Sequence, residues 1–151
     1  MAGSGSNPSS LGSKENKVET FAEVREFIQK HHDLVHDEPF IIGFEYELDG
    51  GRKQSIFVAE LNSEDGHRYL RIETTVVPLA RLSADKCMRI NQMQRVGYLA
   101  TGDLDGEPYV KMCENMAYRT LELTELEYVI ETIAKRADRF EDIIGDGDDF
   151  S

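Results

Sequence analysis

The sequence predicts an α+β fold, in which helices pack against a five-stranded antiparallel sheet. One observation behind this prediction is a segment near the end of the chain, residues 124–144, in which apolar residues recur at spacings of three and four. That is the period of a helix with one apolar face. The other is the region before it, residues 40–113, where alternating apolar segments are separated by turn residues, as in antiparallel strands. A helix with such a face needs a sheet on which to bury it.

The predicted closing helix also has terminal signals. Thr124 and Glu127 have the spacing of a capping box, and Gly145 follows as the usual stop. The apolar face consists of Leu126, Val129, Ile130, Ile133, Ala134, Ala137, Phe140 and Ile144.

The totals favour a single globular domain of 151 residues with a formal net charge of −12. Such an acidic chain is a poor partner for nucleic acid or for an anionic membrane, because both require a positive surface. No apolar run approaches the length of a membrane span. The two cysteines, Cys87 and Cys113, form no C-x-x-C motif, which is typical of a reduced, cytoplasmic protein.

Composition divides the chain into three parts. Residues 1–18 are rich in Gly and Ser, and we expect a disordered tail there. Residues 19–146 form the predicted single domain. Residues 147–151 form an acidic end that we expect to be frayed.

The first element of the predicted domain is a short helix. Thr20 and Glu23 have capping-box spacing, and the apolar periodicity runs to about His32. Residues 33–39 are predicted to be a connector, since Pro39 prevents the helix from continuing.

Three strands follow, at residues 40–48, 55–61 and 67–77, and the short turns between them predict an antiparallel meander. The even-numbered residues of the first strand are apolar and predict its buried face. In the second strand, Ile56 and Val58 are predicted to lie on the face opposite Phe57, Ala59 and Leu61.

A middle helix is predicted at residues 84–94, with Ser83 as its cap. Strands at 98–104 and 107–113 then flank Asp105-Gly106, a strong hairpin signal. Pairing around this turn places Leu99 opposite Met112 and Thr101 opposite Val110. The predicted order of elements is therefore αβββαββα.

This order, in a small acidic chain closed by a long amphipathic helix, resembles the class I chaperones of type III secretion and the related YbjN family. The resemblance extends over residues 20–150. Its most specific parts are Asn91 in the middle helix, the run Gly97-Tyr98-Leu99, the Asp105-Gly106 hairpin and the helix ending at 137–144. The resemblance implies the secretion-chaperone fold, a homodimer and binding of a protein or peptide client.

Catalytic and metal-binding patterns are weak, and we expect no enzyme, no metal and no cofactor. His31, His32 and His36 with Asp37 straddle a helix end and a loop. His31 falls on the apolar face of the first helix, which predicts a partly buried structural histidine. Neither cysteine has an identifiable histidine partner, so packed thiols are expected.

The surplus of apolar side chains predicts a binding surface on the face of the sheet that the helices leave open. We assign Ile56, Val58, Tyr98 and Tyr109 to this face as client-binding residues. The alternatives are a YbjN-like regulatory protein that acts by protein contact and an acidic immunity or inhibitor protein that meets a basic toxin.

Overall fold

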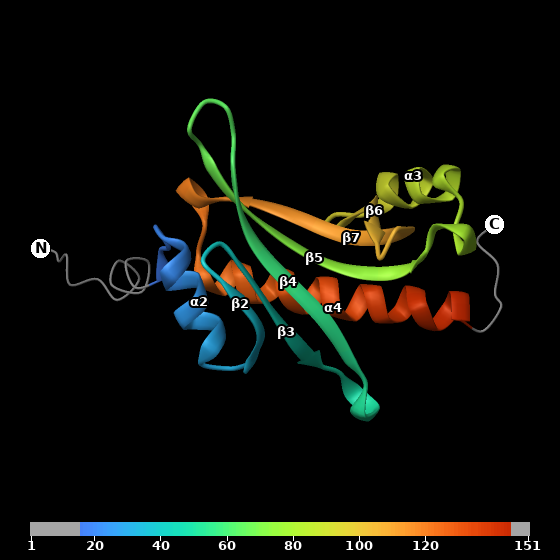
Figure 1. The fold of residues 1–151 in the computed structure, drawn as a ribbon, viewed down its shortest axis with the longest axis horizontal. Coiled ribbons are helices and arrows are strands. Elements are labelled where there is room, and N and C mark those ends of the chain that lie inside the picture. Colours follow the sequence, from blue (N-terminus) through green and yellow to red (C-terminus); the bar gives the residue numbers. More distant parts are fainter. Residues whose placement is uncertain (1–15, 146–151) are drawn as a thin grey trace, which may run out of the picture.

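The computed structural model describes residues 16–145 and confirms an α+β fold with a long C-terminal helix (Figure 1). The antiparallel sheet has six strands, in the order β2-β3-β4-β5-β7-β6. In chain order the main elements are α2 (Phe21–Gln29), β2 (Leu34–Glu38), β3 (Ile41–Glu47), β4 (Lys53–Asn62), β5 (Arg68–Pro78), α3 (Ala84–Met93), β6 (Tyr98–Leu104), β7 (Glu107–Ala117) and α4 (Leu123–Gly145).

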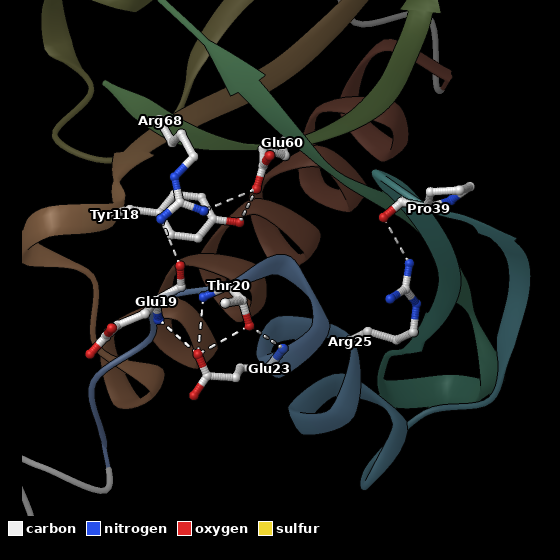
Figure 2. A network of polar contacts seen from close by, with 8 residues as sticks. All are labelled: Glu19, Thr20, Glu23, Arg25, Pro39, Glu60, Arg68 and Tyr118. Atoms are coloured by element: carbon white, nitrogen blue, oxygen red, sulfur yellow. Dashed lines mark hydrogen bonds and ion pairs between the residues drawn. The ribbon is translucent and has the colours of Figure 1, made fainter. Parts of the chain in front are cut away.

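The sixth strand corrects the predicted order of elements. The segment predicted as a connector contains β2, which pairs with β3, so the order is αββββαββα. The strand was not predicted because most of its residues are polar. An edge strand such as β2 does not need alternating apolar residues. Arg25 of α2 fixes the following turn, since its Nη2 donates to the carbonyl oxygens of Glu38 and Pro39, at 2.7 and 3.0 Å (Figure 2).

The first helix begins where it was predicted to begin. Thr20 and Glu23 form the predicted capping box: Thr20 Oγ1 accepts from the backbone N–H of Glu23, and Glu23 Oε1 accepts from the backbone N–H of Thr20. The helix ends at Gln29, however, three residues before the predicted end at His32. His31 and His32 therefore lie in the turn that leads to β2.

The closing helix begins one residue earlier than predicted, and its cap is different. Thr124 lies inside the first turn, and the side chain of Asn16 caps it from the other end of the domain. The Thr124 N–H donates to Asn16 Oδ1, and Asn16 Nδ2 donates to Thr124 Oγ1, both at 3.0 Å. The predicted capping box with Glu127 is wrong because α4 begins at Leu123, so Thr124 already lies inside the helix and is not its N-cap residue.

The helices bury their apolar faces in one core on one face of the sheet. Helix α4 runs along the sheet and packs mainly on β5, with further contacts to β4 and β7 (Figure 1). The predicted apolar face of α4 is confirmed: Leu126, Ile133, Ala134 and Ala137 are fully buried. None of the helices within residues 16–145 is long and apolar enough to cross a membrane.

Helix α3 closes the β6 edge of the sheet. Its predicted cap is confirmed, since Ser83 Oγ accepts from the Lys86 N–H. Asn91 Oδ1 accepts from the Leu99 N–H at 2.6 Å, and Asn91 Nδ2 donates to the Leu99 carbonyl at 3.0 Å. A side-chain amide thus satisfies the backbone of an edge strand, where a neighbouring strand would otherwise pair.

The β6–β7 hairpin has the predicted register. Leu99 pairs with Met112 and Thr101 with Val110, as the Asp105-Gly106 turn required. Asp105 and Gly106 have φ values of 54° and 83°, the pair of positive angles that a two-residue hairpin turn demands.

The folded domain extends further toward the N-terminus than the predicted boundary at residue 19. Val18 is 3% exposed and belongs to the core, and Lys17 forms a β-bridge with Glu122. The remainder of the predicted tail, residues 1–15, and the predicted frayed end, residues 147–151, lie outside the described residues.

Candidate functional site

The structure separates the four predicted client-binding residues. Tyr98 and Tyr109 are half-buried and lie on the sheet face opposite α4, as predicted. Ile56 and Val58 are 0% exposed and belong to the core under the helices. The assignment of Ile56 and Val58 to the open face is therefore wrong, and neither side chain is available to a client.

The physical reason is the register of the β3–β4 hairpin. Ile56 pairs with Phe44, and Val58 pairs with Ile42, both on the apolar face of β3. Residues that are directly opposite in an antiparallel pair share a face. The turn at residues 49–51 thus places the even-numbered residues of β4 in the core and leaves Phe57 on the other face.

On that other face, which we call the uncovered face, apolar side chains cluster around Phe57. Phe57 lies over Gly43, where an added Cβ would stand 2.7 Å from its ring, and its ring meets the edge of His36 at 5.9 Å. The half-buried apolar residues that share this face include Ile41, Phe57, Ala59, Leu61, Tyr69, Tyr98, Ala100 and Tyr109.

The charged side chains at the centre of the uncovered face find their polar partners within it. Lys111 Nζ lies 2.8 Å from Glu73 Oε2, and Arg71 Nε donates to Asn115 Oδ1 at 3.0 Å. Cys113 lies between them, 4% exposed, and burial together with the charge of Glu73 raises its pKa to about 11. The face is therefore mostly apolar and nearly neutral, although the chain as a whole is strongly acidic.

A groove of about 660 Å³ lies on the helix side, where the C-terminal end of α2, the start of α4 and the end of β3 meet. Strand β2 pairs with β3 no further than Phe44, so Glu45–Glu47 pairs with β4 on one side and, among the described residues, with no strand on the other. The Leu48 N–H donates to the Arg52 carbonyl. Backbone groups alternate in direction along a strand, so the N–H of Glu47 points away from β4 and toward the groove.

Aromatic rings line one wall of the groove. His32 stacks on Phe44 with a centroid separation of 4.5 Å and is tilted against Tyr46 at 5.7 Å. His31 meets Phe27 edge-on at 5.6 Å. Burial lowers the pKa of His32, and the neighbouring charge of His31 adds to the effect, so His32 is neutral at pH 7.

Acidic residues also line the groove. Glu47 of β3, Glu127 and Glu131 of α4, and also Asp33 and Glu45 line the groove, against the single lysine Lys53. Burial raises the pKa of the Tyr46 hydroxyl, and the charges of Glu131 and Glu127 raise it further, against an opposing effect of Lys135. The negative field of the two α4 carboxylates therefore reaches the aromatic wall.

The histidine predictions are partly corrected. His31 is exposed rather than partly buried, because α2 stops before it, and His32 is the half-buried one. No group of three or more His, Cys, Asp or Glu side chains within residues 16–145 is arranged to hold a metal ion. The groove carboxylates are thus spread around a wall instead of converging on one point.

A separate polar network ties the N-terminal segment to the sheet (Figure 2). Tyr118 Oη donates to Glu60 Oε1 at 2.8 Å, and the Arg68 guanidinium lies over the Tyr118 ring, 4.4 Å from its centroid. Arg68 Nη2 also donates to the Glu19 carbonyl at 2.7 Å. Burial and the bond to Glu60 raise the pKa of Tyr118, so the phenol stays protonated as a donor. The network has a structural role.

Sequence reasoning missed the groove, although two signals for it exist. Phe27, His31 and His32 are aromatic residues close together at a helix end, and Glu127 and Glu131 are acids one helical turn apart. Nothing in the sequence places these two groups beside the same edge of β3, since that depends on how α2 and α4 pack.

No protein-family model matches this chain, and no curated protein matches it.

Proposed function

We propose that this chain is a non-enzymatic, cytoplasmic protein-binding module that holds an extended segment of a client protein, in the manner of the secretion chaperones that it resembles. The observation that carries the proposal is the groove at the free edge of β3. An extended peptide can continue a sheet there, with backbone hydrogen bonds supplying affinity and alternate side chains entering the adjoining groove.

The geometry of the groove supports a polypeptide ligand. Its open edge offers the backbone of Glu47, and its walls offer the rings of His32 and Tyr46. The cysteines do not favour a catalytic role, because both are buried and burial raises the pKa of each thiol.

We further propose that the uncovered face joins two copies of the chain into a homodimer. Two chains of net charge −12 repel each other over most of their surface, and self-association favours a face whose charges already cancel. The face around Phe57, Tyr98 and Tyr109, with its Lys111–Glu73 pair, has that property.

Two alternatives keep the same protein-contact chemistry. A YbjN-like regulatory protein would act by contact without secretion, and an acidic immunity or inhibitor protein would bind a basic toxin. The net charge of −12 is the observation that favours the inhibitor. A secretion apparatus or effector encoded beside the gene favours the chaperone, whereas an adjacent toxin gene favours the inhibitor.

The experiment that tests the proposed function selects random displayed peptides of roughly eight residues on the full chain and measures the enriched peptides by fluorescence anisotropy. Glu47→Pro removes the outward N–H without touching the β3–β4 ladder, and we expect it to weaken binding by about tenfold or more. Glu47→Gln, the matched control, keeps the N–H and should lose less affinity for the peptide. Enrichment of no peptide, or equal binding by the Glu47→Pro variant, would overturn the proposal.

A further inference from the structure

The walls of the groove differ in chemistry from the uncovered face, and this difference indicates what enters it. The uncovered face is nearly neutral, whereas the groove is lined by five carboxylates and one lysine. A purely apolar side chain would leave this negative field uncompensated. The groove therefore favours a cationic side chain.

The arrangement of the carboxylates distinguishes between kinds of cation. No three of the potential metal ligands within the described part of the chain converge on one point, as a metal ion would require. Glu127 and Glu131 stand on successive turns of α4, and Glu47 approaches from β3. Separated acceptors suit a guanidinium or ammonium group at the end of a long side chain, because such a group donates in several directions.

The aromatic wall supports the same ligand. Tyr46 and neutral His32 line the groove, and a cation over the face of a tyrosine ring is attracted by the negative electrostatic potential of that face. The long apolar stem of arginine or lysine also packs well on Phe27 and Val35, of which Val35 is 66% exposed. Rings, apolar contacts for the stem and carboxylates thus line one groove.

We propose that the groove recognises one arginine or lysine side chain of an extended client segment. The segment pairs with the free edge at Glu47. Its basic side chain passes His32 and Tyr46 and ends between Glu127 and Glu131. Lys135, which lies 2.6 Å from Glu131, competes for that carboxylate, so Glu127 is the less encumbered acceptor. This inference rests on the proposed function, because it names the chemistry of the segment that the same groove holds.

The test uses the peptides enriched in the display experiment. We expect them to share a central arginine or lysine. Replacing the arginine by citrulline, which has the same shape without the charge, is expected to weaken binding by about tenfold. The affinity of the arginine peptide is expected to fall between about 50 mM and about 500 mM salt, while that of the citrulline peptide changes little.

Matched variants of the chain locate the contact. Glu127→Gln and the double variant Glu127→Gln/Glu131→Gln should lower the affinity for the arginine peptide in that order. Glu125→Gln, an exposed acid on the same helix that does not line the groove, should leave it unchanged. The citrulline peptide should bind all four proteins alike.

Two results would overturn the inference. One is a set of enriched peptides without a shared basic position that still lose affinity with Glu47→Pro, in which case the proposed function stands and the basic specificity fails. The other is an equal loss of affinity for the arginine peptide in the Glu125→Gln and Glu127→Gln variants. That result would mean that the effect comes from the overall charge of the chain and not from a contact in the groove. Failure to enrich any peptide removes the proposed function as well.

Discussion

Phe57 rests on Gly43 across the β3–β4 pair, so closely that a methyl group at Gly43 would stand 2.7 Å from its ring. The glycine is needed for this close approach, since any side chain at this position would meet the aromatic ring.

The first prediction follows from this contact. Gly43→Ala should destabilise the domain by about 1 kcal/mol, because the ring of Phe57 must move away from its place between Gly43 and His36. Phe57→Leu should remove most of the penalty when it is combined with Gly43→Ala. A double-mutant cycle by urea denaturation measures the coupling. Additive effects of the two substitutions would contradict the assigned contact.

The second prediction concerns the closing helix. Ile133 is fully buried, so Ile133→Asp places an unpaired carboxylate under α4, at a cost of several kcal/mol against a typical total stability of ~5–15 kcal/mol. We expect loss of the cooperative thermal transition in circular dichroism. Lys135→Asp, at an exposed position of the same helix, is the control and should still melt cooperatively. A parent-like transition in the Ile133→Asp variant would mean that α4 presents another face to the sheet.

The third prediction concerns pH. Burial raises the pKa of Glu141 to about 7 from its ordinary value of 4.5; a hydrogen bond with Gln54 opposes the shift, and the charge of Asp138 adds to it. Between these two pH values the folded state holds a proton that the unfolded chain has released. Stability from this group therefore decreases as the pH rises through that interval.

Glu141→Gln should remove this dependence. We expect the variant to melt a few degrees above the parent at about pH 8 and close to it at about pH 4, with the difference growing in between. Thermal melts across the range measure the difference. Glu125→Gln is the control on the exposed side of α4. A parent and a Glu141→Gln variant with parallel pH profiles would show that the carboxyl is ionised in the fold.

The fourth prediction concerns the oligomeric state. Light scattering at micromolar concentration should give about twice the chain mass of 17.1 kDa. Tyr98→Glu together with Tyr109→Glu should give the single-chain mass with a cooperative melt retained, since charge is placed in the apolar interface. Tyr128→Glu, at a 52% exposed tyrosine of α4, should leave the dimer intact. A parent of single-chain mass at high concentration would exclude this assembly.

The fifth prediction concerns the cap from the N-terminal segment. Asn16→Ala should destabilise the domain by about 1 kcal/mol, because Thr124 N–H loses its acceptor at the start of α4. Chemical denaturation provides the measurement. Asn16→Asp keeps an acceptor and should retain most of the stability. Equal loss of stability in both variants would contradict the assigned role of the Asn16 side-chain oxygen as the acceptor for the Thr124 N–H.

Periodicity was sufficient for the helices and most of the sheet. The spacing of Leu126, Ile133 and Ala137 defines one face of α4 without reference to any other element, and the turn at Asp105-Gly106 fixes the register of its own hairpin. Both are local signals. Strand β2 lacks such a local signal. It is held in place by the bond from Arg25 to the Glu38 carbonyl and by pairing with β3, and both contacts depend on the fold.

The error at Ile56 and Val58 has a different origin. Their segment alternates apolar side chains on both faces, so composition cannot decide which face is buried. The hairpin turn at residues 49–51 decides it, by pairing Ile56 with Phe44. The groove could not be predicted from the sequence. His32 and Glu127 line the same groove only because of the way in which the helices α2 and α4 pack in the folded domain.

The bond between Asn16 and Thr124 joins residues 108 positions apart, and it has a consequence for synthesis on the ribosome. The core side of the sheet is complete in sequence before α4 exists, and α4 is the helix that packs along β5, β4 and β7. A nascent chain must therefore expose Ile72 and Met112 until α4 has emerged, since both side chains belong to the core that α4 helps to close. Translation should pass through a stage at which the half-made protein itself needs protection from aggregation.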